Sequence, residues 1–222
     1  CRTAYALLHD NQAKVALWVV YTLTPQHAIG CEPRTNAFAP DQSLPQGQRS
    51  ELADYAHSGY DTGHIANDGD MSWDPTVERE SFILSNMAPQ LPNLNRGIWK
   101  LLESSVRSWT YSQQHAHTVY AGSIYNYATD KKVGPDNVVV PHGFYKIVID
   151  DVTHKSYAFL FPHSANLGTD ISTVQVTVAD VERASGIVFP VPDNKTVKNA
   201  LPQADFGGFT KAKQAACPRN PN

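Results

Sequence analysis

The stretch NLNRGIWKLLESSVRSWTYS, residues 93–112, decides the fold class, because its apolar residues recur with the period of an α-helix. These residues would form one stripe along the helix: Leu94, Ile98, Leu101, Leu102, Val106 and Trp109. The sequence therefore predicts a long amphipathic helix that ends near Ser112. Pro89 and Pro92 precede it and Gly97 lies near its start, as expected where a helix begins.

On both sides of this helix the sequence is rich in β-branched and aromatic residues, which favour strands. The predicted strands occupy residues 13–24 before the helix and residues 117–125, 137–150, 156–162 and 173–178 after it. Residues 25–59 are expected to form a long loop, residues 179–186 a short helix ending at Gly186, and the chain from Pro190 onward a surface meander. Strands with hairpin spacing around a long helix predict an α+β fold, with an antiparallel β-sheet flanked by helices.

The composition predicts one globular domain over residues 1–222, with 41% hydrophobic and 18% charged residues. No apolar run reaches the roughly 18 to 20 residues of a membrane helix, so a membrane span is excluded. The net charge of −3 argues against binding nucleic acid through overall positive charge, although a local basic patch could bind it. No glycine-rich phosphate loop follows a predicted strand, which argues against an enzyme that uses a nucleotide cofactor.

The three cysteines, Cys1, Cys31 and Cys217, allow at most one intramolecular disulfide and leave one thiol, and their spacing fits no zinc site. The positions of Cys1 and Cys217 at the two ends indicate structural roles. This cysteine usage favours an oxidising setting, hence a secreted or extracytoplasmic protein. The chain begins at Cys1 without an initiator methionine, which predicts that it was processed or trimmed.

Polar side chains also recur along the predicted helix, where Asn95, Trp99, Glu103 and Arg107 follow one another at i, i+4. The ordinary interpretation is an exposed Glu103–Arg107 ion pair, with Asn95 capping the helix. The alternative is a catalytic site that also includes His64, from the stretch YDTGHIANDGDM. An amide oxygen suits a hard cation, an imidazole can act as a base and a guanidinium can face a phosphate.

Two segments, SGYDTGH (58–64) and SFILSNMAPQLPNLNRGIWKLLE (81–103), resemble the signature of the DNA/RNA non-specific endonucleases. These are endonuclease G-like His-Me finger, or ββα-metal, nucleases, which typically read Asp-Arg-Gly-His and later Ser-Asn, Pro-Gln, Leu-Asn, Trp and Leu-Glu. The resemblance continues in the same order through VYAGSIY (119–125), VVVPHGFYKIVID (138–150), AFLFP (158–162) and VERASGIVF (181–189). It therefore covers most of the chain and implies a ββα-metal active-site motif.

The resemblance implies a role for each matching residue. His64 matches the general base, which takes a proton from the water that attacks phosphorus. Asn95 matches the single protein ligand of a hydrated Mg²⁺, an ion that stabilises charge on the scissile phosphate and on the leaving oxygen. Glu103 matches a carboxylate that binds the metal through water.

Three further matches would support this chemistry. Arg107 matches a phosphate-facing arginine on the same helix. Arg34, in the loop CEPRTNAF, lies about where the family has another phosphate-binding arginine. Asn86 matches an asparagine close to the site, which we expect to make supporting hydrogen bonds.

The implied activity is Mg²⁺-dependent, sugar-non-specific hydrolysis of phosphodiester bonds, with Mn²⁺ able to substitute. A site that reads only the backbone would cut double- and single-stranded DNA and RNA alike. Because such a nuclease is toxic to its maker, export, compartmentation or an inhibitor or immunity protein is expected. Many relatives form homodimers, and the sequence leaves open whether this chain does.

One residue departs from the pattern, because Thr62 stands where the family usually has arginine. Loss of a charge-assisted phosphate contact would weaken turnover or substrate binding. A first alternative is therefore a catalytically weakened or inactive relative that still binds nucleic acid. A second alternative is a secreted interaction domain whose partner is a protein, but it leaves the joint presence of His64, Asn95 and Glu103 unexplained.

Overall fold

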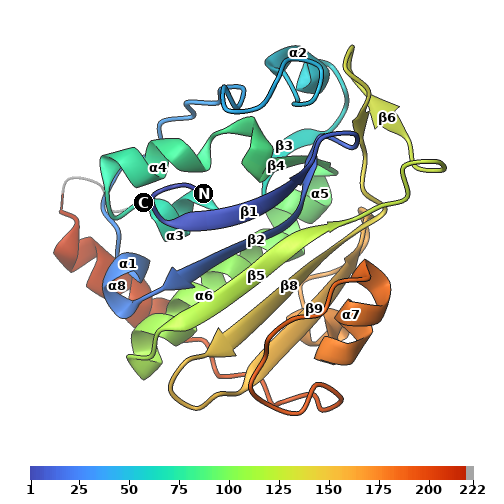
Figure 1. Cartoon of the computed structure of the whole chain (residues 1–222). Helices are drawn as coiled ribbons and strands as arrows, with labels where there is room; N and C mark the ends of the chain where they lie inside the picture. Colours follow the sequence, from blue (N-terminus) through green and yellow to red (C-terminus); the bar gives the residue numbers. More distant parts are fainter. Residues whose placement is uncertain (219–222) are drawn as a thin grey trace.

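A six-stranded antiparallel sheet forms the centre of the molecule in the computed structural model, which describes residues 1–218 (Figure 1). The strands lie in the order β1-β2-β5-β8-β9-β10. In chain order they are β1 Tyr5–Asp10, β2 Val15–Leu23, β5 His117–Ile124, β8 Gly143–Asp150, β9 Ser156–Pro162 and β10 Gln175–Val176. This mixture of an antiparallel sheet and flanking helices confirms the predicted α+β class.

Strand β8 is buried along its whole length because helices cover both faces of the sheet. Successive side chains of a strand point to opposite faces, so Phe144 belongs to one hydrophobic core and Tyr145 and Ile147 to another. Helix α6 (Lys100–Gln113) packs on the first face and helix α7 (Val178–Ser185) on the second. Figure 1 shows α6 behind the sheet and α7 in front of it.

The long predicted helix is confirmed over most of its length, but its first turns are irregular. Before α6 come a short helix α5 (Pro92–Leu94) and a π-helical turn η2 (Asn95–Trp99), in which Gly97 has φ −99° and ψ −117°. A π turn holds one more residue than an α turn and therefore shifts the register. Trp99 consequently leaves the predicted polar stripe and is 1% exposed, with its indole against the ring of Phe144.

The predicted strands over residues 13–24, 117–125 and 156–162 and the helix that ends at Gly186 are confirmed. Residues 137–150 do not form one strand. Val138–Val139 (β7) pair with Lys132–Val133 (β6), and β8 begins only after Pro141, which has no N–H group for a ladder.

The predicted strand over residues 173–178 is wrong in extent. Only Gln175–Val176 pair with β9, since Ile171–Val174 form a 3₁₀ helix (η3) and Val178 begins α7. The alternating valines of this segment are buried by these short elements, as Val174 and Val178 show.

A separate two-stranded ribbon, β3 (Asp61–His64) and β4 (Met87–Gln90), leads into α6 and forms the expected ββα arrangement. A Cβ atom on Gly63 would lie 2.1 Å from Oε1 of Gln90, so glycine at this position leaves room for the buried Gln90 side chain. The two strands are connected by α3 (Asp68–Met71), α4 (Pro75–Ser81) and a 3₁₀ turn η1 (Leu84–Asn86). Within the predicted loop of residues 25–59 lie the short helices α1 (Pro25–Ala28) and α2 (Leu52–Tyr55).

The prediction of a meandering C-terminal tail is wrong for helix α8 (Phe206–Ala216), which packs against α6. Cys217 follows this helix and forms a disulfide with Cys31. Cys1 has a free, exposed thiol, so the structural role predicted for it is wrong, whereas that of Cys217 is confirmed. No helix in the described part of the chain is both long and apolar enough to cross a membrane.

Candidate active site

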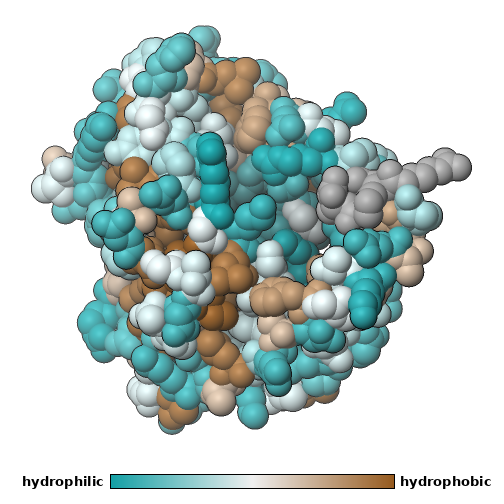
Figure 2. Space-filling view, turned by 180° about the vertical axis from the view of Figure 1, so that it is seen from behind, coloured by the Kyte–Doolittle hydropathy of each residue, from teal (hydrophilic) through white to brown (hydrophobic). Residues whose placement is uncertain are grey.

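A cleft of about 830 Å³ opens between the β3–β4 ribbon, the start of α6 and the loop that contains Arg34. Figure 2 shows the molecule from the side of α6, where hydrophilic side chains border a hollow. The cleft is lined by Pro33, Arg34, Phe38, Asp61, Thr62, His64, Asn67, Asp68, Gly69, Asn95, Arg96, Lys100, Glu103, Arg107 and Lys213. Among these described residues the cationic side chains outnumber the carboxylates, although the whole chain carries a net charge of −3.

His64 is the last residue of β3, and its imidazole lines the cleft with 7% of the residue exposed. The rings of Phe82 and Phe38 pack against it, with centroids 4.8 and 5.7 Å away. Burial lowers the pKa of His64 to about 4, an effect that Asp68 opposes and Arg34 reinforces. A general base usually has a pKa near neutrality, and the pKa of His64 lies below that value. The imidazole is therefore uncharged at pH 7, and one ring nitrogen can accept a proton.

The titration of His64 can be measured directly. In an NMR pH series on the metal-free protein, its ring signals should shift with a midpoint near pH 4, because burial disfavours the charged form. In the unfolded chain the pKa of a histidine is about 6.5, so the unfolded state binds the proton first as the pH falls. The free energy of unfolding should therefore decrease as the pH falls from about 6.5 towards 4. A midpoint at or above the ordinary value would contradict the apolar surroundings.

Asn95 lies at the start of the π turn, and its amide is oriented by an acidic neighbour. Its Nδ2 donates to Oδ2 of Asp61 at 2.9 Å. Arg96 also donates to both carboxylate oxygens of Asp61, at 2.8 and 2.6 Å, and together these contacts lower the pKa of Asp61 against the effect of burial. Because an ionised carboxylate only accepts hydrogen bonds, Nδ2 must face Asp61, which leaves Oδ1 of Asn95 for another ligand.

Glu103 lies on α6, two turns after Asn95, and is 8% exposed. Burial raises its pKa to about 7, against the attraction of Lys146 and Arg107. Its Oε1 lies 3.4 Å from Nζ of Lys146, a buried lysine on β8 that also lies 4.3 Å from the centroid of the Trp99 ring. The exposed Glu103–Arg107 ion pair of the ordinary interpretation is therefore not formed.

Arg107 lines the cleft as a largely buried cation, with 14% of its side chain exposed. Its Nη1 donates to Oδ1 of Asp70 at 2.9 Å and to Oδ1 of Asn67 at 2.7 Å. Tyr21 donates to the other oxygen of Asp70 at 2.6 Å, so a buried network fixes the guanidinium. A Cβ atom on Gly69 would lie 2.8 Å from Nη1, so a side chain at that position would displace the guanidinium from this network.

Arg34 enters the cleft from the irregular segment after α1. It forms an ion pair with Asp68 and donates to Oδ1 of Asn36 at 2.8 Å. Its guanidinium carbon lies 4.8 Å from the centroid of the Phe82 ring, the same ring that packs against His64. Its side chain is 44% exposed, so the charge remains accessible to a ligand.

Asn86 is the one predicted site residue that does not line the cleft. It is fully buried, accepts from the backbone N–H of Ala66 at 2.9 Å, and donates to the carbonyl oxygens of Ala66 and Ser81, both at 2.8 Å. These bonds fix the chain just after His64, which agrees with the expected supporting role.

The structure thus brings His64, Asn95, Glu103, Arg107 and Arg34 to one cleft from three distant segments. Sequence reasoning missed the partners that orient them, namely Asp61, Asn67, Asp70 and Lys146, and the cleft cations Arg96, Lys100 and Lys213. Arg96 adjoins Asn95 and Asp61 lies three residues before His64, and this proximity in sequence was the available signal. Lys213 lies 106 positions after Arg107, and nothing in its local sequence marks it.

The family model of the DNA/RNA non-specific endonucleases matches residues 1–196. Human mitochondrial endonuclease G is 31% identical over 202 residues, covering 85% of this chain and 68% of the relative. Nuclease C1 of Cunninghamella echinulata var. echinulata is 32% identical over 204 residues, covering 85% of this chain and 81% of the relative. A crystal structure of an EndoG/EndoGI complex, reported for the mechanism of EndoG inhibition, matches with a TM-score of 0.78 and 29% identity, covering 89% of this chain and 88% of that chain.

Proposed function

Because the chain belongs to the DNA/RNA non-specific endonuclease family and is a nucleic-acid hydrolase, we propose that it is a Mg²⁺-dependent, sugar-non-specific endonuclease with His64 as general base and Asn95 as metal ligand. The observation that carries the proposal is the convergence of His64, Asn95, Glu103 and two arginines on one cleft. Each of these residue types suits one requirement of phosphodiester hydrolysis.

The residues present fit a hydrated hard cation. Within the described residues no group of three or more His, Cys, Asp or Glu side chains could hold a metal ion, so a dedicated all-protein cage is absent there. Asn95 would hold the ion through its unpaired Oδ1, and Glu103 would hold it through water. Mg²⁺ commonly retains several waters and uses one or two protein oxygens, and Mn²⁺ should substitute. When bound, such an ion would supply charge stabilisation at the scissile phosphate and the leaving 3′ oxygen.

His64 would remove the proton from the attacking water. Its low pKa keeps the ring uncharged at neutral pH, and it lines the same cleft as Arg34 and Arg107. The negative charge of a bound phosphate would stabilise the imidazolium that forms, since an opposite charge raises the pKa of a histidine. The apolar rings of Phe38 and Phe82 would hold the imidazole in place during the transfer.

Arg34 and Arg107 would hold the backbone of the substrate. Both are in the cleft, and Arg107 is fixed by Asp70 and Asn67 before a ligand arrives. Phosphate contacts fix the register of a nucleic acid without reading bases, so the enzyme should cut single- and double-stranded DNA and RNA. We further propose that the 1–222 chain acts as a single nuclease domain.

The alternative of a weakened or inactive binding protein depends on Thr62, which lines the cleft on β3. A guanidinium is nevertheless present beside it, because Arg96 binds the adjacent Asp61 and keeps 73% of its side chain exposed. The guanidinium of Arg96 favours activity over the inactive alternative, because it supplies positive charge close to position 62, where this chain lacks the family's arginine.

Thr62→Arg should raise kcat/KM for plasmid cleavage. A directed charge-assisted contact is worth roughly 1.5 to 3 kcal/mol, which corresponds to a gain of about 10- to 100-fold. Initial rates of nicking of supercoiled plasmid would measure it, with Thr62→Met as the control of similar length without charge. Equal rates for Thr62→Arg and the wild type would show that residue 62 does not meet a phosphate.

Localisation and partners extend the proposal. The Cys31–Cys217 disulfide favours an oxidising compartment, so we place the mature protein outside the cytoplasm, as a secreted nuclease. The relative in the solved complex is bound to its inhibitor. An inhibitor or immunity protein for this chain would protect the cell that makes it from its nuclease activity. A homodimer is a further possible assembly, which light scattering would establish.

The test is degradation of supercoiled plasmid and of total RNA by the purified chain, with Mg²⁺, with Mn²⁺ and with excess EDTA. We expect both polymers to be cut with either metal ion and neither to be cut in EDTA. Binding without nicking under every metal ion would instead support the inactive alternative. Absence of both binding and nicking would favour a protein-binding domain.

A further inference from the structure

We propose that Lys213, on the C-terminal helix α8, contacts a backbone phosphate of the substrate and that the Cys31–Cys217 disulfide holds it in the cleft. This inference rests on the proposed nuclease function. It adds a substrate-binding residue from a part of the chain that lies beyond residues 1–196, the segment that the family model matches.

Helix α8 reaches the cleft by packing along α6. Tyr111 of α6 contacts Phe209 of α8, with ring centroids 5.9 Å apart. Lys213 follows Phe209 by four residues, so both side chains lie on the same side of α8. This side faces α6, and the Lys213 side chain lines the cleft that Arg107 of α6 also lines.

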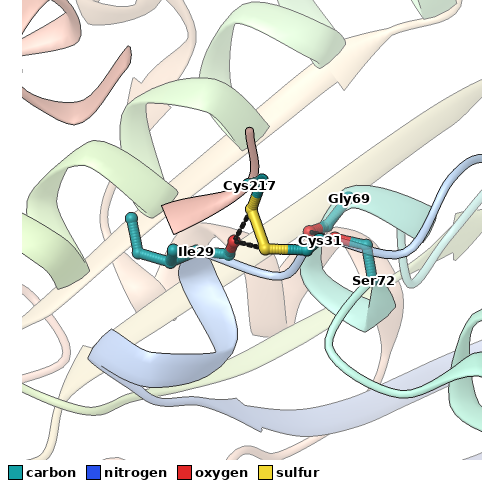
Figure 3. Close-up of a disulfide and its surroundings, with 5 residues drawn as sticks. All are labelled: Ile29, Cys31, Gly69, Ser72 and Cys217. Atoms are coloured by element: carbon teal, nitrogen blue, oxygen red, sulfur yellow. Dashed lines mark hydrogen bonds between the residues drawn. A yellow bond between two sulfur atoms is a disulfide. The ribbon is translucent and has the colours of Figure 1, made fainter. Parts of the chain in front are cut away.

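The disulfide fixes the end of α8 to the wall of the same cleft. Figure 3 shows Cys31 beside Gly69, in α3, and Ser72, just after it, and both sulfur atoms of the disulfide next to Ile29, which follows α1. The loop on the other side of the bond is fixed as well, because the N–H of Glu32 donates to the carbonyl oxygen of Ser72 at 2.8 Å.

One covalent bond therefore positions two cations. Arg34 lies three residues after Cys31, and Lys213 lies four residues before Cys217. Both line the cleft, one from the loop and one from α8. A phosphate bound between them would meet positive charge from both segments.

Among residues 1–218 the ammonium of Lys213 has no direct counter-ion. Within residues 1–218 its ammonium forms no ion pair or hydrogen bond, whereas Arg34 and Arg107 are already paired with Asp68 and Asp70. Partial burial lowers the pKa of Lys213, Arg107 lowers it further, and the two aspartates act in the opposite direction. A partly desolvated, unpaired ammonium gains more from an incoming anion than a paired one does, so a phosphate is the ligand that it suits.

Binding and its salt dependence test the contact without requiring catalysis. On a His64→Ala background in EDTA, fluorescence anisotropy would measure the affinity for a fluorescein-labelled 20-base-pair DNA between 50 and 300 mM NaCl. We expect Lys213→Met to weaken binding about 3- to 10-fold at 100 mM NaCl and to reduce the slope of log K against log salt by about one. Lys213→Arg should restore most of both.

Lys211→Met is the matched control, because Lys211 is an exposed lysine on the same helix that does not line the cleft. Lys211→Met in the His64→Ala background should have the same affinity for DNA and the same salt slope as the His64→Ala protein itself. The proposal is overturned if Lys213→Met has the parent's affinity and slope. Failure of the nuclease function would be visible separately, as absence of cleavage by the wild-type chain, while the anisotropy still decides whether Lys213 meets nucleic acid.

The role of the disulfide has its own readout. Cys217→Ser should raise KM for plasmid, as Lys213→Met should. Adding Lys213→Met to Cys217→Ser should raise KM little further, because α8 without its disulfide has already lost the Lys213 contact. Thermal unfolding would establish that Cys217→Ser is folded, and wild type treated with dithiothreitol gives the same comparison without a substitution. An unchanged KM after complete reduction would overturn the positioning role.

Discussion

His64→Ala should lower kcat/KM for cleavage of DNA and RNA by about 10²- to 10⁴-fold, the range that a positioned general base contributes. The loss should lie in kcat, since the imidazole is proposed to accept a proton, whereas Arg34 and Arg107, which line the same cleft, are proposed to hold the phosphates. The affinity for nucleic acid in EDTA should therefore change little. Single-turnover rates on a labelled duplex, with anisotropy for binding, would separate the two effects.

His142→Ala provides the control for this substitution. His142 is 55% exposed, bonds to Asp130 and does not line the cleft, so its removal should leave both quantities unchanged. A His64→Ala protein that retains its fold by circular dichroism and also retains wild-type kcat would refute the general-base assignment.

Asn95→Ala should reduce kcat by about 10²- to 10³-fold at a fixed Mg²⁺ concentration and raise the Mg²⁺ concentration needed for half-maximal activity. The magnitude follows from the several kcal/mol of charge stabilisation that a bound metal ion supplies. Only one protein oxygen is proposed to bind the ion directly, so its removal leaves Glu103 acting through water. Mn²⁺ binding followed by electron paramagnetic resonance would give the affinity independently of turnover.

Asn93→Ala is the matched control, because Asn93 is exposed, lies two residues earlier and does not line the cleft. A second comparison, Asp61→Asn, tests the orientation of the amide. Loss of the carboxylate removes the group that fixes Nδ2 of Asn95, so the requirement for Mg²⁺ should rise while the oxygen ligand remains. If Asn95→Ala binds Mn²⁺ with wild-type affinity, the ion lies elsewhere.

Much of the fold could be predicted because it follows from periodic burial. The helix over residues 93–112 and the strands β2, β5 and β9 carry their apolar residues at regular spacing, since each packs against the sheet core. The helical spacing of apolar residues did not predict the π turn at Gly97. This residue has no Cβ atom, and it adopts φ and ψ values outside the helical region. Trp99 therefore looked polar-facing in sequence and is part of the core.

Two other errors, at the C-terminal helix and at the cysteines, share a cause, because both concern parts of the chain that distant partners stabilise. Helix α8 contains Gly207 and Gly208 and has no buried residue, so its own sequence gives little helical signal. It is held instead by α6 and by the bond to Cys31. Three cysteines allow three pairings, and spacing along the chain cannot select among them.

The candidate site was predicted through family resemblance more than through physical pattern. His64, Asn95, Glu103 and Arg107 matched a known order of residues, and the structure brings them together. Their charge states were not readable from sequence, since the low pKa of His64 depends on Phe38 and Phe82. Side chains that are distant in sequence but close in the structure, such as Lys146 and Glu103, leave no pattern in the local sequence that would predict their contact.

The disulfide joins positions 186 residues apart, so the chain between Cys31 and Cys217 is a covalent ring that contains every predicted site residue. Exposed irregular segments inside this ring, such as residues 42–49, are where proteases cut most readily. A single cut there opens the ring but releases no fragment, because the two pieces stay joined through sulfur and through the sheet. A single cut there should therefore leave the cleft assembled.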